Sequence, residues 1–147
     1  LVEILIVVVI LGILAAIVIP QFTSASESAK ASSLVSQLQT IRSQLELAQI
    51  QHQGSYPDLV TNGWTPLTSE TEQAAAYTAG DASGNEVGPY LQQAPVNPFT
   101  GVETVAAAAG ANVGWVYSNT TGRITASISA AKATELGMNT TNDVTTY

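Results

Sequence analysis

The chain has 147 residues, of which 46% are apolar and only 10% are charged, and its four basic and eleven acidic side chains give a net charge of −7. This composition is too hydrophobic for a disordered chain, and the shortage of Lys and Arg argues against nucleic acid as a partner, because binding to phosphates depends on those residues. Cysteine is absent, so no disulfide can stabilise the fold, and the length is that of one modest domain.

The first 22 residues are the most distinctive stretch of the chain, and they read LVEILIVVVILGILAAIVIPQF. No polar side chain lies between Ile4 and Ile19, and a helix from Leu1 to Ile19 would be about 28 Å long, roughly the thickness of a bilayer core. Glu3 is the exception, since a carboxylate in such a segment persists mainly where it has a partner. No Lys or Arg precedes Lys30, so the nearest cation is an N-terminal amine, either of the same chain or of another copy.

This stretch closely resembles the N-terminal helix of type IV pilins and of the major pseudopilins of type II secretion systems. The resemblance is close over residues 1–22 and extends to the remainder only as general architecture. It implies that a prepilin peptidase removes a short basic leader, that the new N-terminus is methylated, and that two residues precede Leu1 in the mature chain. It also implies that this helix mediates assembly, through Glu3, Gly12, Pro20 and Phe22.

Beyond Pro20 the pattern changes from apolar on every side to a single apolar stripe, which predicts the amphipathic half of the same helix over residues 23–53. The apolar positions recur at steps of four and three residues and are Leu34, Leu38, Ile41, Leu45 and Ala48. Gly54 supplies a C-cap and Pro57 blocks continuation, so the helix should end near Gln53. A helix of this length would measure about 80 Å, so one half must project from the head.

The segment between Gly12 and Pro20 is predicted to be the weak part of the helix. Pro20 lacks an N–H and clashes with the carbonyl of Ala16, which predicts a kink or a locally opened turn. The resemblance implies that this segment is unwound in a filament. A helix that is only bent is the alternative.

Residues 54–147 are predicted to form a globular head. Residues 54–101 are rich in turn signals and are interpreted as a loop region, with one short helix at about 69–78 behind a capping box of Ser69 and Glu72. The following part, residues 102–129, contains three segments rich in β-branched and aromatic residues. These predict three antiparallel strands, at 102–106, 112–118 and 123–129.

The predicted sheet has one apolar face, which should pack on the helix stripe. Its residues occupy alternate strand positions and are Trp115, Tyr117, Ile124 and Ile128. The C-terminal segment, residues 130–147, holds either one helical turn capped by Gly137 or a fourth strand. The predicted fold class is therefore α+β, with a long helix as the spine and a small antiparallel sheet as the head, and the resemblance implies the pilin-like fold.

Candidate catalytic residues are few. His52, Ser55 and Asp58 lie close together in sequence at the predicted end of the long helix, where a histidine is usually solvated. No nucleotide-binding, zinc-protease or serine-hydrolase motif is present. The chain is therefore interpreted as a protein that is not an enzyme.

Two loops carry oxygen donors of the kind that bind calcium. Asp81, Ser83 and Asn85 alternate in the first loop, but the loop lacks the glycine and the final glutamate of a calcium-binding loop. The second group is centred on Asp143. Pseudopilins commonly bind calcium near the C-terminal end of the sheet, but neither group matches a family motif. Turn chemistry is the preferred explanation, and no cofactor is assigned.

These features predict a structural subunit that polymerises through its apolar helix into an open helical filament of identical copies. The expected product is an extracellular filament of the type IV pilus kind on the bacterial surface, formed by pilus or secretion assembly machinery from subunits held in the inner membrane. One alternative is a major pseudopilin in a periplasmic filament, which the absence of Cys and the string GPYLQQAPVNPFTG favour. The other is a monomeric binding module on a single-span anchor.

Overall fold

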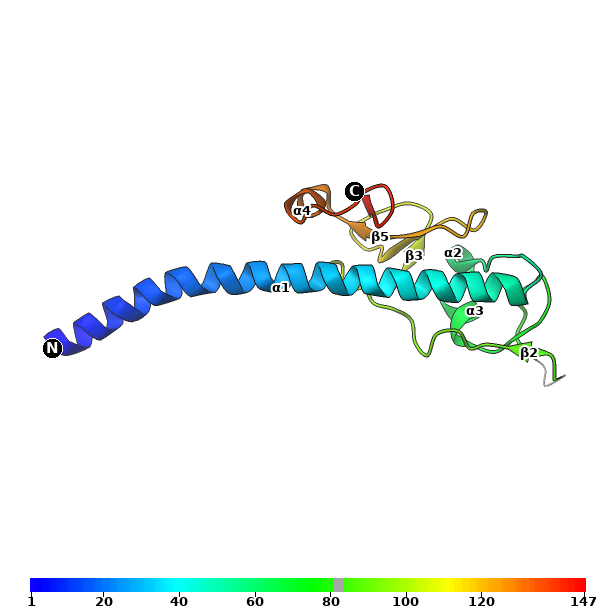
Figure 1. The fold of residues 1–147 in the computed structure, drawn as a ribbon, viewed down its shortest axis with the longest axis horizontal. Coiled ribbons are helices and arrows are strands. Elements are labelled where there is room, and N and C mark those ends of the chain that lie inside the picture. The colour runs from blue at the N-terminus through cyan, green and yellow to red at the C-terminus, as the bar shows by residue number, and fades with distance from the viewer. Residues whose placement is uncertain (81–83) are drawn as a thin grey trace.

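The computed structural model describes residues 1–80 and 84–147. One helix, α1 (Val2–Gln51), runs the length of the molecule, and the small head packs along its C-terminal half (Figure 1). The N-terminus lies at the free tip of this helix, whereas the C-terminus lies on the head. Three helices precede all the strands and only α4 interrupts them, so the fold class of the described residues is α+β.

Helix α1 continues through Gly12 and Pro20, the two positions that bound its predicted weak part. Residues 2–51 are helical without interruption, and the helix curves along its N-terminal part (Figure 1). Pro20 has no N–H to donate to the carbonyl of Ala16. Near it, the Thr23 hydroxyl donates to the carbonyl of Ile19, and the Ser24 hydroxyl donates to the carbonyl of Pro20, both at 3.1 Å. The bent helix, rather than an unwound segment, is therefore the state of the single chain.

The C-terminal end of α1 is closed by backbone bonds from the residues that follow it. The N–H of His52 bonds the carbonyl of Ala48 at 2.9 Å, and the N–H of Gly54 bonds that of Gln49 at 2.8 Å. Gly54 adopts φ +86°, which favours glycine. The helix thus ends at Gln51, two residues before the predicted end.

The predicted helix at 69–78 is wrong. That segment contains strand β1 (Thr71–Glu72), which pairs antiparallel with β2 (Glu86–Val87). Two short helices precede it, α2 (Leu59–Asn62) and α3 (Thr65–Thr68). Both carry sequence signals that the pattern reading missed, because Asp58 caps α2 through the N–H of Thr61 and Pro66 lies in the first turn of α3.

The main sheet has four strands in the order β3 (Val105–Ala106), β4 (Trp115–Tyr117), β5 (Ile124–Ile128) and β6 (Val144–Thr146). Only β4 and β5 are antiparallel, whereas β3 pairs parallel with β4 and β5 with β6. The prediction of a wholly antiparallel sheet is therefore wrong. The reason lies in the connections. Residues 107–114 and 129–143 each carry the chain back to the end of the sheet at which the previous strand began, so the next strand runs in the same direction.

The C-terminal segment contains both of the structures that the sequence left open. Helix α4 (Ala130–Glu135) is followed by Gly137, which adopts φ +60°, and the chain then forms β6 on the edge of the sheet. The register pairs Ala126 with Val144, so the last residues of the chain extend the sheet. Sheet extension therefore does part of what a disulfide does in other small domains.

The core lies between α1 and the sheet. It contains Leu34, Leu38, Ile41, Leu45, Trp115, Tyr117, Ile124 and Ile128, all at most 2% exposed. All five residues of β5 are buried, because the loop 107–114 covers the outer face and the Ser127 hydroxyl bonds the backbone of Gly110 there. The buried side-chain amide of Asn97 donates to the carbonyls of Gly114 and Ser127 at 2.7 and 2.8 Å.

Candidate functional site

The N-terminal part of α1 projects beyond the head with all its side chains in solvent. Residues 1–26, called here the projecting half, are all exposed, and none of the described head residues lies over them (Figure 1). Among the described helices, α1 alone is long and apolar enough to cross a membrane. Its most apolar stretch of residues is not buried in the molecule. An apolar surface of this length cannot remain in water, so it requires lipid or protein around it.

Glu3 is the only charged side chain in the projecting half and lies close to its tip. The nearest cation in the chain is the amine of Leu1, 3.8 Å from Glu3 Oε2, and both groups are fully exposed. Water screens a pair of this kind, so the contact contributes little stability. The carboxylate is thus available to a stronger partner once the surrounding water is removed.

The other predicted assembly residues also lie on the projecting half and face solvent. Gly12 has no atom within 4 Å of the position that a Cβ would occupy, Pro20 is exposed, and Phe22 is 72% exposed. The four residues are spread along the helix and do not converge on a pocket. They can therefore act through contacts with other molecules, but not together as one cavity.

Sequence reasoning missed a ridge of small residues that runs along α1 at intervals of four. Its members are all exposed and are Gly12, Ala16, Pro20, Ser24, Ser28, Ser32, Ser36 and Thr40. The hydroxyls of Ser24, Ser32, Ser36 and Thr40 donate to the carbonyls one turn earlier at 3.0–3.1 Å. Because these four hydroxyls are satisfied within the helix, the ridge can approach another helix closely without leaving any of the four unpaired. The spacing was visible in the sequence.

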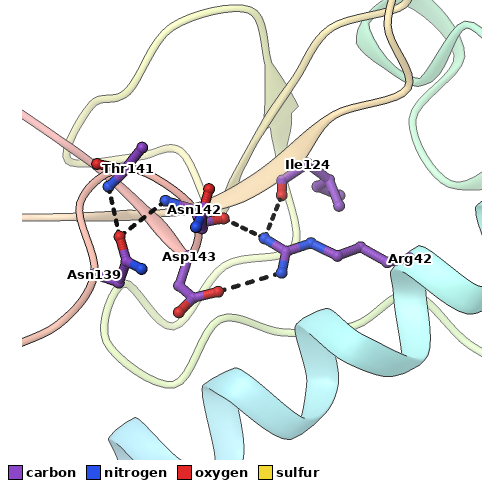
Figure 2. Close-up of polar contacts among 6 residues, drawn as sticks. All are labelled: Arg42, Ile124, Asn139, Thr141, Asn142 and Asp143. Carbon is purple, nitrogen blue, oxygen red and sulfur yellow. Dashed lines mark hydrogen bonds and ion pairs between the residues drawn. The ribbon is translucent and has the colours of Figure 1, made fainter.

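Arg42 connects the C-terminal half of α1, on which the head packs, to the C-terminal loop of the chain. Figure 2 shows its guanidinium reaching from α1 to the C-terminal loop, where Nη1 lies 3.2 Å from Asp143 Oδ1. Nη2 donates to the carbonyl of Ile124 at 3.0 Å and to that of Asn142. One planar cation thus joins the helix, strand β5 and the C-terminal loop.

The same contacts bear on the calcium candidates. The Asp143 carboxylate is paired with Arg42, and the Asn139 Oδ1 accepts the N–H groups of Thr141 and Asn142 at 2.9 and 3.1 Å (Figure 2). Among residues 1–80 and 84–147 no three acidic, His or Cys side chains gather in a way that could hold a metal.

In the other candidate loop, Asp81 and Ser83 lie outside the described residues. Asn85 is exposed, and its backbone carbonyl accepts the N–H of Gln73 at 2.9 Å.

A second tie lies where α1 leaves the head. Lys132 of α4 is 3.6 Å from Glu27 on α1 and 2.9 Å from Glu135, and Lys30 is 3.6 Å from Glu27. The hydrogen bond that Lys132 donates to the Glu135 carboxylate is the main cause that raises the pKa of Lys132. These groups are partly solvated, so the cluster positions α4 more than it stabilises the fold.

His52 is buried, which contradicts the expectation of a solvated residue at the helix end. Its Nδ1 donates to the carbonyl of Ala74 at 2.8 Å, its Nε2 lies 3.0 Å from the Thr71 hydroxyl, and its ring stacks on Tyr77 at 3.8 Å. These contacts hold strand β1 at Thr71 and the bend at Ala74, which together replace the predicted helix. The ring is buried by contacts with Thr71 and Tyr77, which are too distant in the chain for a local sequence pattern to predict.

The two residues grouped with His52 have separate structural partners. The carbonyl of Ser55 accepts the Tyr77 hydroxyl at 2.9 Å. Asp58 caps α2 and accepts from the Asn119 side chain at 2.6 Å, and its hydrogen bonds with Thr61 are the main cause that lowers its pKa. The three residues do not form a nucleophile–base arrangement.

Comparisons of the chain with protein-family models, with curated proteins and with solved structures gave no match. The feature that bears on function is thus the molecule's own division into two parts. One part is a folded head tied to α1 by its core, by Arg42 and by Lys132, and the other is a bare apolar helix with one acid near its tip.

Proposed function

We propose that the protein is a filament subunit of the type IV pilus kind with the pilin-like fold. Before assembly, the projecting half lies in the inner membrane, and the head lies outside it. During assembly, the helix leaves the lipid and joins a bundle of identical helices at the filament centre. In both environments its apolar surface stays out of water.

The observation that carries the proposal is the continuity of the projecting half with the helix that supports the head. Residues 2–51 form one helix, and within the part of the chain that the structure describes nothing covers its apolar part. A flexible linker would leave the head free to rotate on its anchor. A continuous helix instead fixes the direction of the head relative to the helix bundle, as a regular polymer needs.

The ridge of small residues supports the same proposal. Helices that pack without a hydrophobic driving force between them use small residues to bring their backbones close. The ridge runs from the apolar part into the polar part of α1, and its members stay exposed in the single chain. It therefore offers a continuous surface on which neighbouring copies of the helix can pack.

Glu3 is proposed to set the axial register of the polymer. In the water-free bundle its carboxylate would pair with the N-terminal ammonium of a neighbouring copy, so that only one register leaves no buried charge unpaired. Removing one partner of a buried pair costs about 3–5 kcal/mol, which is enough to prevent a subunit from joining. Glu3 thus acts through assembly and not through membrane insertion.

The proposal is tested by Glu3→Leu and Glu3→Gln in the native host. Both variants should reach the membrane at the wild-type level, because loss of a charge does not hinder insertion, but neither should yield filaments by shearing and electron microscopy. Glu46→Leu is the matched control, since it removes an exposed acid from the same helix. Normal filament yield from either Glu3 variant would refute the assigned role.

A pseudopilin of a type II secretion system is the second candidate, and the absence of cysteine favours it. Both candidates share the polymer and the role of Glu3, and they differ in where the filament lies. Electron microscopy of cells with and without the gene distinguishes them, because a pilus subunit gives long surface fibres and a pseudopilin gives a short periplasmic filament. A monomeric anchored module predicts no filament and no effect of Glu3 substitution.

A further inference from the structure

A polar cavity of about 580 Å³ lies on the head, beside the C-terminal loop and away from the projecting half. Its walls come from α1, from the turn between β4 and β5, and from the loop before β6. The lining includes Arg42, Glu46, Tyr56, Arg123, Asn139 and Asn142. The volume falls within the range of roughly 300–1,000 Å³ that is typical of small-molecule sites.

The floor and one wall of the cavity are rigid. Arg42 is fixed by Asp143 and by two carbonyls, as Figure 2 shows. The Tyr56 ring lies directly on the backbone of Gly122, where a Cβ would come within 2.1 Å of the ring. Gly122 also adopts φ +67°, a conformation that favours glycine, so a side chain at this position of the turn would be both strained and blocked by the ring. A site with fixed walls loses little entropy when it binds.

Several polar groups in the cavity have no partner in the described part of the chain. The Arg123 guanidinium, the Glu46 carboxylate and the Tyr56 hydroxyl make no hydrogen bond or ion pair there. Asn139 uses its Oδ1 in the turn, which leaves its Nδ2 donors free, and the Asn142 side-chain amide is likewise unused. The cavity therefore offers donors and acceptors side by side.

The charges in the cavity are informative because basic residues are so rare in this protein. Lys30 and Lys132 pair with Glu27, and Arg42 pairs with Asp143, so Arg123 is the one basic side chain in residues 1–80 and 84–147 without an ion pair. A free guanidinium binds a carboxylate through two parallel hydrogen bonds. The chain's net charge of −7 repels a polyanion more strongly than a ligand with one negative charge, which a single guanidinium can neutralise.

We propose that this cavity binds an acidic monosaccharide of the hexuronate class. The carboxylate of the sugar would lie on Arg123, and its hydroxyls would donate to Glu46 and accept from the Asn139 and Asn142 amides. The Tyr56 ring supplies an apolar wall for the C–H face of the sugar. Hydroxyls both donate and accept, which matches the mixture of unpartnered groups on the walls.

The experiment is a titration of the full chain in detergent micelles with sodium glucuronate, followed by saturation-transfer NMR. For a ligand of this size we expect a dissociation constant on the order of 1 mM, and binding to neutral glucose at least about tenfold weaker. Arg123→Ala should weaken glucuronate binding by about ten- to a hundredfold, and Arg123→Lys should retain part of it.

Lys30→Ala is the matched control, because it removes one positive charge from α1 outside the cavity, and it should bind glucuronate like the wild type. Far-UV circular dichroism verifies that each variant is folded. The proposal is overturned if the wild type shows no saturable glucuronate binding, if Arg123→Ala binds as tightly as the wild type, or if serine binds in preference to glucuronate, since a zwitterion would use the same two charges.

Discussion

The two halves of α1 belong to one helix but depend on different surroundings. In the C-terminal half, Leu34, Leu38, Ile41 and Leu45 are at most 1% exposed beneath the sheet. In the projecting half, side chains that are equally apolar are exposed, and Leu11, for example, is 59% exposed. The first set stabilises the head within one chain, whereas the second can be stabilised only by another molecule.

The same difference appears in the charged residues. Arg42 and Lys132 tie the head to the helix through partners on the same chain. Glu3, at the far end, has the exposed amine of Leu1 as its one ionic partner among the described residues. The charges that tie the head to the helix are therefore paired within the chain, whereas the acid of the projecting half is left open to other molecules.

The largest expected effect comes from truncating the buried stripe. Leu38→Ala should lower the free energy of unfolding of the head by about 2–5 kcal/mol, because it leaves a cavity between α1 and the sheet. Leu11→Ala, a matched change in the projecting half, should leave it unchanged. Urea unfolding in detergent, followed by the near-ultraviolet signal of Trp64 and Trp115, measures both. Equal losses would mean that the two halves are not independent.

A smaller effect is expected at Arg42. Arg42→Ala leaves Asp143 and two carbonyls without their donor, which should cost about 2 kcal/mol for a half-buried group. Hydrogen exchange should accelerate in β6 and the loop before it, while β1 and β2 keep their protection. Arg123→Ala removes the same side chain nearby and should not alter exchange in β6. Unchanged protection in Arg42→Ala would show that sheet pairing alone holds the C-terminus.

The smallest effect is expected at Tyr117. Its hydroxyl is buried with no hydrogen-bond partner among the described residues, and burial raises its pKa above the ordinary value of 10.0. The folded state therefore holds this proton more tightly than the unfolded state. The stability that results is complete below about pH 10 and is lost as the pH rises further.

Tyr117→Phe should accordingly keep or raise stability at neutral pH by up to about 1 kcal/mol and should reduce the loss on going to about pH 11. Part of that loss should remain, because burial also raises the pKa of Tyr77. Urea unfolding at the two pH values measures the difference. A marked loss at neutral pH would mean that the hydroxyl has a partner in solution.

Much of the helix was predictable because its signals are local or periodic. The change from an apolar run to a stripe at Pro20 locates the projecting part, and Gly54 locates the end to within a few residues. The strands β4 and β5 lie within predicted segments, and Gly137 does follow a helical turn. In each case the residues that determine the structure are close together in the chain.

The errors share one physical cause, which is that distant residues outweigh local ones. The segment at 69–78 has a capping pattern, but the buried ring of His52 bonds Thr71, which lies in strand β1, and the carbonyl of Ala74, which lies in the bend that follows. Strand direction was likewise decided by where the connections return the chain, and α4 makes β6 parallel to β5.

An apolar helix of membrane length, a single acid near its start and a small α+β remainder follow from the residues alone, because composition and periodicity express those properties directly. The pairing of Asp143 with Arg42, and the position of the unpaired Arg123 beside a polar cavity, arise only when the chain folds. Arg42 and Asp143 are separated by 101 positions in the chain, so no local pattern could pair them. Their meeting depends on α1 and the sheet packing together first.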